Sequence, residues 1–197
     1  MRKLTALPAV LAAVLACAGC TASTSNLSHS VEVMMGNSDC TGFVVHPRAV
    51  VTSADCAAGG LRNAAVSVDG TAYALDTMPT GGEPYPPVWE PAAGSIAVLH
   101  TTDSIVGAHT LPADAVSDTV PSSGLVLAAG TSFSIETDDV TESPSRAATG
   151  MAKSVRPGTP VLTTAGDIIG VVDRDHTGDR VELLRGAPYD WIAGLPR

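Results

Sequence analysis

Two cysteines, Cys40 and Cys56, bound a short apolar stretch in the first third of the chain. Between them, two runs of mainly apolar residues at 43–45 and 49–52 flank a His-Pro-Arg turn. Runs of β-branched residues on both sides of a turn favour a β-hairpin, and a cysteine at each outer end favours a disulfide. The segment therefore predicts a hairpin closed by a Cys40–Cys56 bond, and the rest of the chain must fold around it.

The rest of the chain also favours strands. Of its 197 residues, 45% are hydrophobic and 16% charged, which suits a packed globular protein, and the 19 glycines and 14 prolines punctuate short Val, Ile, Leu and Thr runs. Residues 64–77 alternate on either side of Asp69-Gly70, a strong hairpin signal. Residues 94–100 and 124–130 are apolar runs of strand length. This pattern predicts an all-β fold with many turns.

The charge balance limits the partners. There are 20 Asp and Glu residues against 11 Lys and Arg, with no basic cluster, and removing a leader that carries Arg2 and Lys3 deepens the acidity. Nucleic acid and anionic membrane surfaces need a basic face, so neither is expected as a partner. The acidity suits an exported, water-facing surface.

The N-terminus predicts export. A charged start and an apolar run at 4–18 are typical of a secretory signal over residues 1–19, too short to remain as a spanning helix. Ala18-Gly19 before Cys20 resembles a bacterial lipobox, so Cys20 is the expected lipidation site, with Cys17 as a weaker alternative and cleavage without lipid as another. Lipid at Cys20 would be the chain's only membrane contact.

Residues 20–33 are then expected to form a flexible, Ser/Thr-rich tether before a folded domain over 34–197. After the leader is removed, Cys40 and Cys56 are the remaining pair, and with scattered histidines they supply too few ligands for a metal. No nucleotide, phosphate-loop or calcium-loop motif occurs, so no cofactor is expected. Residues 80–91 are dense in Pro and Gly and predict a loop, in which Tyr85 and Trp89 either bind a partner or pack on the core.

Four segments, in order, resemble the trypsin/chymotrypsin-like serine proteases. They are the cysteine-bounded hairpin, the strand at 94–100, residues 155–172 around Pro160-Val161, and the closing segment 187–195. In the last of these, Tyr189-Asp190-Trp191-Ile192 is similar to the family's Tyr-x-x-Trp-Ile-like signature. The resemblance implies two antiparallel six-stranded β-barrels, the first over about 34–110 and the second over about 120–185, and a C-terminal helix over about 187–195. A β-sandwich is the alternative fold.

The same resemblance implies a lost catalytic triad. Asp55 stands at the histidine position, Ser95 at the aspartate position and Pro157 at the serine position. Proline offers no nucleophile and no N–H for an oxyanion hole, and removing a triad serine or histidine costs about 10⁶ in turnover. Met151, at the specificity position, carries no charge to select a substrate.

The sequence thus predicts a non-catalytic binding or scaffold module at the cell envelope, secreted or lipid-anchored, whose expected partner is an envelope protein or peptide. Two alternatives stay open. One is a serine-type hydrolase with an unorthodox or relocated site, in which Ser154 is served by His46 or His100, although no nucleophile-elbow motif surrounds any serine. The other is a purely structural protein without a ligand.

Overall fold

The computed structural model of the chain describes residues 30–35, 38–57, 65–75, 88–89, 96–107, 116–117, 125–136, 145–175, 178–185 and 189–190. The strands of the first half are β1 (Ser30–Met35), β2 (Ser38–His46), β3 (Ala49–Ser53), β4 (Ala65–Val68), β5 (Thr71–Ala74), β6 (Val88–Trp89) and β7 (Ile96–His100). Helix α1 (Ala54–Ala57) follows β3. The second half holds β8 (Leu125–Ala128), β9 (Thr131–Ile135), β10 (Ser145–Thr149), β11 (Pro160–Leu162), β12 (Ile168–Asp175) and β13 (Gly178–Leu183).

The first half is an antiparallel sheet that curls almost into a barrel. Its order is β5-β4-β1-β2-β3-β7-β6, and the chain just beyond β5 returns to the chain just beyond β7. There Leu75 forms a bridge with Thr101, and the Thr102 amide donates to the Ala74 carbonyl at 3.0 Å. Two segments therefore lie along the same edge of β7: β6 pairs with its first residues, and Leu75 pairs with Thr101 just beyond its last residue.

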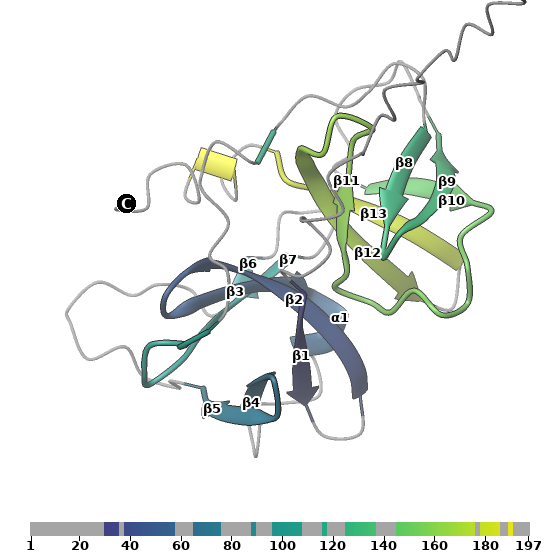
Figure 1. Cartoon of the computed structure of the whole chain (residues 1–197). Coiled ribbons are helices and arrows are strands. Elements are labelled where there is room, and N and C mark those ends of the chain that lie inside the picture. Colours follow the sequence, from purple (N-terminus) through teal and green to yellow (C-terminus); the bar gives the residue numbers. More distant parts are fainter. Residues whose placement is uncertain are drawn as a thin grey trace, which may run out of the picture.

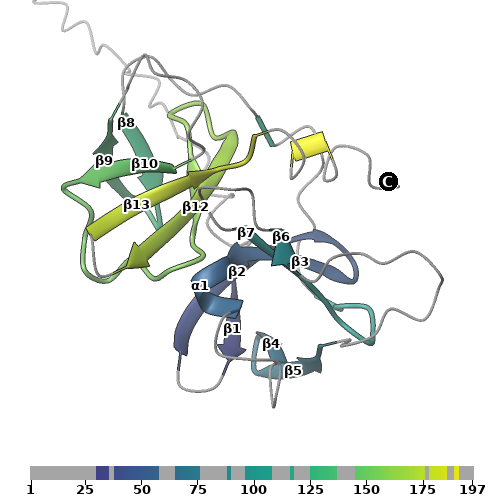
Figure 2. The ribbon, with the colours of Figure 1, turned by 180° about the vertical axis from the view of Figure 1, so that it is seen from behind.

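The second half is a closed barrel in the order β10-β13-β12-β11-β8-β9, completed by pairing of β9 with β10. Figures 1 and 2 show the two halves side by side, the first in purple to teal and the second in green to yellow. The expected all-β, two-barrel architecture is confirmed, although in the first half a bridge and a hydrogen bond, rather than a strand pairing, connect the two ends of the sheet. The described strand β6 makes the first sheet seven-stranded where six were expected.

Alternation along the central strands builds two cores from one sheet. In β2 and β3, Val44 and Val50 point into the first barrel, while Phe43 and Val51 point outward into a second cluster. That second cluster also contains Ile168 and other residues of the second barrel, so it joins the two halves. A third cluster fills the second barrel. The outward face of β3 and β7, and of β2 at Phe43, is therefore buried as well as the inward face.

Two turns follow directly from local sequence. Asp69 and Gly70 take positive φ values of 49° and 80° between β4 and β5, the geometry of a two-residue hairpin loop that favours Asp-Gly. Ala129 and Gly130, at 47° and 75°, form the same kind of turn between β8 and β9. The hairpin predicted over residues 64–77 is confirmed, and so is the strand predicted at 124–130, except that it ends at Ala128 and residues 129–130 form the turn.

The expected tether is too long at its C-terminal end. Residues 30–33, assigned to it, belong to β1, which pairs with β2 and β4. The reason is the alternation of Val31 and Val33, buried in the first core, with exposed Glu32 and Met34. The predicted loop 80–91 likewise contains a strand, since β6 ends at Trp89. Of the predicted C-terminal helix, residues 189–190 are helical and the rest lies outside the described residues.

Candidate functional site

The segment at the expected nucleophile position is fixed between the two halves. The Thr41 amide of β2 donates to the Pro157 carbonyl at 2.8 Å, and the Thr41 hydroxyl reaches the same oxygen at 3.1 Å. On the other side, the Gly158 amide donates to the Val172 carbonyl of β12 at 2.7 Å. The loop is therefore held from both barrels by its backbone.

Gly158 allows this close approach. Its φ is +80°, and a Cβ there would overlap the carbonyl oxygen of Thr41 and the hydroxyl of Thr52. Only glycine combines a left-handed backbone with such proximity at low cost. Because Thr52 of β3 touches the loop, the end of β3 and the segment around Pro157 lie together at the seam between the barrels.

Asp55 is exposed on α1, three residues beyond Thr52. The Thr52 hydroxyl donates to the Thr41 carbonyl at 2.6 Å, which ties the strand before α1 to the residue that holds Pro157. The structure thus brings together two of the three segments matched to the triad, those of Asp55 and Pro157. Ser95 lies outside the described residues.

A serine and a carboxylate do meet at this seam. The Ser53 hydroxyl donates to Asp173 Oδ1 at 2.6 Å, joining β3 to β12 across 120 residues of sequence. Ser53 is 0% exposed and Asp173 is 7% exposed, so no substrate carbonyl can reach the hydroxyl. The pair is a structural link between the barrels. The sequence did not predict it, because no motif near Ser53 indicates a hydrogen-bond partner 120 residues away.

The two described histidines lie elsewhere. His46 and His100 both neighbour Ala49, at the opposite end of β3 from Ser53, about 13 Å away along the strand. Ser154 lines a cavity beside Thr41, which is separated from His46 by roughly 16 Å of β2. The placement therefore does not favour a relocated site built from Ser154 with His46 or His100.

Arg174 crosses the space between β12 and the loop that contains Met151. Its guanidinium donates to the carbonyls of Ala152 and Lys153 at 2.8 and 3.0 Å, and its Nε donates to Asp179 at 2.8 Å. Met151 itself is buried in the core of the second barrel. The loop that contains Met151, the residue at the expected specificity position, is thus joined to β12 by an arginine side chain.

Arg156 forms another link across the seam. Its Nη1 lies 2.8 Å from Asp39 Oδ1 and 3.8 Å from Glu32 Oε1, both on the first sheet. These side chains are about half exposed or more, so the ion pairs add little to the stability of the fold. They do fix the position of the guanidinium. Arg156 therefore reaches from the nucleophile loop of the second half over to β1 and β2.

Other predicted features have mixed outcomes. The Cys40–Cys56 disulfide is present and indicates an oxidising compartment. Cys20 and Tyr85 lie outside the described residues, while Trp89 lies on β6 and pairs with Ile96.

Within the described ranges, no group of three or more His, Cys, Asp or Glu side chains could hold a metal ion. No helix in that part of the chain is long and apolar enough to span a membrane.

Comparison with known proteins places the fold. No protein-family model matches the chain, and no curated protein matches its sequence. Among solved structures, the inactive form of the Mycobacterium tuberculosis Rv3671c protease matches with a TM-score of 0.56 at 16% identity, over 83% of this chain and 87% of that one.

Two further neighbours are named for inactivity or for binding. A scabies mite inactivated protease paralogue matches with a TM-score of 0.59 at 13% identity, covering 85% of this chain and 93% of its own. Human heparin binding protein matches with a TM-score of 0.60 at 15% identity, covering 86% and 91%. The chain has the double-barrel fold of the trypsin/chymotrypsin-like serine proteases.

Proposed function

We propose that this protein is an exported, non-catalytic member of the trypsin-like fold that acts as a binding or scaffold module at the cell envelope. The observation that carries the proposal is Pro157 at the position matched to the nucleophile, with its carbonyl held by Thr41. Proline has no side-chain nucleophile and no N–H to donate to an oxyanion, and an oxyanion donor alone contributes about 10²–10³ in rate.

The surroundings of Pro157 support the same proposal. The hydroxyls of Ser53 and Thr41 are hydrogen bonded to Asp173 and Pro157 across the seam, and the Thr52 hydroxyl donates to the Thr41 carbonyl within the first half. A catalytic serine needs a base within about 3 Å and an open face toward the substrate. Here the polar groups of the seam link the two barrels, and Arg174 links β12 to the loop of Met151, the residue at the expected specificity position.

Lipid attachment at Cys20 and export are part of the proposal. They rest on the lipobox-like sequence and on the disulfide, which suits an oxidising compartment. Mass spectrometry of the mature N-terminus from a membrane fraction tests the anchor, and an unmodified, soluble mature form contradicts it.

Labelling with a fluorophosphonate probe tests the absence of a reactive serine. We expect no labelling of the purified protein under conditions in which an active trypsin is labelled fully. Ser154→Ala and Ser53→Ala variants serve as site controls. Labelling that one of these substitutions removes would overturn the proposal and identify the reacting serine.

Binding itself is tested by capture of partners from envelope extract. The proposal assigns contact with an envelope protein or peptide to the aromatic residues Tyr85 and Trp89. A Tyr85→Ala/Trp89→Ala variant should therefore lose a partner that the unchanged protein retains. Identical capture by both proteins contradicts this assignment of the binding surface.

A further inference from the structure

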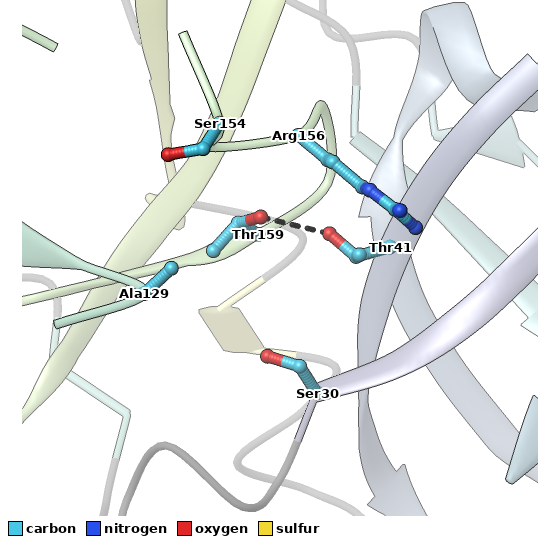
Figure 3. A pocket seen from close by; sticks show the side chains of 6 residues that line it. All are labelled: Ser30, Thr41, Ala129, Ser154, Arg156 and Thr159. Atoms are coloured by element: carbon cyan, nitrogen blue, oxygen red, sulfur yellow. Dashed lines mark hydrogen bonds between the residues drawn. The ribbon is translucent and has the colours of Figure 1, made fainter. Parts of the chain in front are cut away.

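A cavity of about 340 Å³ opens at the seam, on the side of the Pro157 loop where Arg156 crosses to the first sheet. Figure 3 shows its lining: Thr41 and Ser30 come from the first half, and Ala129, Ser154, Arg156 and Thr159 come from the second. Its volume is at the small end of ligand sites, enough for one small molecule or for the end of a larger one.

Four of the six lining residues carry hydroxyl groups. The Thr41 hydroxyl donates its hydrogen to the Pro157 carbonyl, so in its 2.8 Å contact with Thr159 it accepts and Thr159 donates. Thr159 then keeps its lone pairs to accept from a ligand. Ser30 and Ser154 are exposed, and their hydroxyls can turn either to donate or to accept.

Arg156 adds donors to the cavity, and carboxylates of the first sheet offset its charge. One of its terminal nitrogens lies 2.8 Å from Asp39 and 3.8 Å from Glu32. Guanidinium has five N–H donors, so the others remain for neighbouring groups. Because carboxylates offset the guanidinium charge, the cavity offers little extra to an anion, and no carboxylate among its lining residues attracts a cation. Its donors and acceptors suit an uncharged ligand with many hydroxyls.

The same lining residues also carry aliphatic groups: the Ala129 methyl, the methyl groups of Thr41 and Thr159, and the methylenes of Arg156. A sugar ring has both features, hydroxyls around its rim and C–H groups on its faces. We propose that this cavity binds one neutral sugar unit, free or at the end of a glycan. The inference rests on the proposed function in one respect, that this protein binds rather than cleaves.

Saturation-transfer NMR and titration calorimetry of the full-length protein test the site, in a detergent without a sugar headgroup. The probes are glucose, galactose, arabinose and N-acetylglucosamine, followed by oligosaccharides that end in whichever sugar binds. We expect saturable binding of a sugar to the unchanged protein. Arg156→Gln should weaken this binding about tenfold, the effect of losing a charged hydrogen bond. Ser154→Leu should abolish the binding, because the leucine side chain fills the cavity. Tighter binding of the oligosaccharide than of the free sugar would identify a glycan as the source.

Ser134→Leu is the matched control, because Ser134 is equally exposed but lies on β9 and does not line the cavity. It should bind like the unchanged protein. If Arg156→Gln lowers the melting temperature of the protein, a Ser30→Leu variant takes its place in the comparison. The leucine narrows the cavity from the side of the first half and should weaken sugar binding. The inference is wrong if none of the four sugars binds saturably, or if binding survives Ser154→Leu and Ser30→Leu. Such a result leaves the lack of catalysis untouched, whereas peptide hydrolysis would contradict the proposed function and not the sugar site.

Discussion

Gly158 is the residue on which the seam depends most sharply. Its left-handed backbone and its contact with Thr41 and Thr52 both exclude a side chain. Gly158→Ala should therefore lower the free energy of unfolding by more than about 2 kcal/mol, since it combines backbone strain with steric overlap.

Gly150 provides a matched control for that substitution. Its φ is +79°, nearly the same as that of Gly158, but a Cβ there would meet nothing within 4 Å. Gly150→Ala should cost only the backbone strain, about 1 kcal/mol. Urea unfolding of both variants separates the two effects, and equal losses would show that the contact at Gly158 contributes nothing.

His46 gives the stability of the protein a dependence on pH. Partial burial, and then the nearby Arg48 charge, lower the pKa of its imidazole below the usual 6.5. The unfolded chain therefore takes up a proton at a higher pH than the folded chain does. Stability from this residue is full above about pH 6.5 and falls as the pH drops through that value toward the lowered pKa.

The His46→Gln variant tests this dependence. Its melting temperature should fall less than that of the unchanged protein between pH 7.5 and pH 5.5, since glutamine takes up no proton. Other titrating groups change both proteins alike, so the difference between the two curves is the relevant quantity. Parallel curves over this range would mean that His46 has the same pKa folded and unfolded.

At the scale of elements, the disulfide joins β2 to α1. It closes a loop with a sequence separation of 16, for which restriction of the unfolded chain stabilises by about 3 kcal/mol. A Cys40→Ser/Cys56→Ser variant should lose about that amount in chemical denaturation. Reductant should destabilise the unchanged protein similarly and leave the variant unaffected. An equal response of both proteins to reductant would contradict the assignment.

Sequence reasoning recovered those elements whose signals are local. The hairpin around Asp69-Gly70, the cysteine-bounded pair β2–β3 and the buried strand β7 all follow from residues close together in the chain. It placed the start of the fold too late, because Val31 and Val33 are only two buried residues within a Ser/Thr-rich segment. The small strand β6 is hidden among prolines and glycines, and its partner Ile96 supplies the pairing.

The candidate site was predicted less completely, for a physical reason. Which segments meet at the seam followed from the resemblance, but the contacts that hold it did not. The contacts that hold the seam join residues more than a hundred positions apart: Ser53 with Asp173, Thr41 with Pro157, and Arg156 with Asp39. Each is a hydrogen bond or ion pair between polar groups, and no sequence pattern marks it. Such contacts exist only once the two barrels have been placed against each other.

At the scale of the whole molecule, the two barrels share a buried cluster that includes Phe43, Val51 and Ile168, and a set of polar links. In an enzyme of this fold, the seam is where the reacting groups must face a substrate. Here Pro157 and buried Ser53 occupy it, and Arg174 links β12 to the loop that contains Met151. The seam is organised for contact between the barrels.

The most direct test of that claim is turnover of a diverse peptide library by the purified, disulfide-intact protein, followed by mass spectrometry. An active trypsin diluted to a millionth of its usual concentration sets the detection limit, because loss of a triad residue costs about 10⁶. We predict no cleavage above the level of a heat-unfolded control at any pH from 5 to 9. Cleavage at defined bonds that scales with the concentration of folded protein would contradict the account.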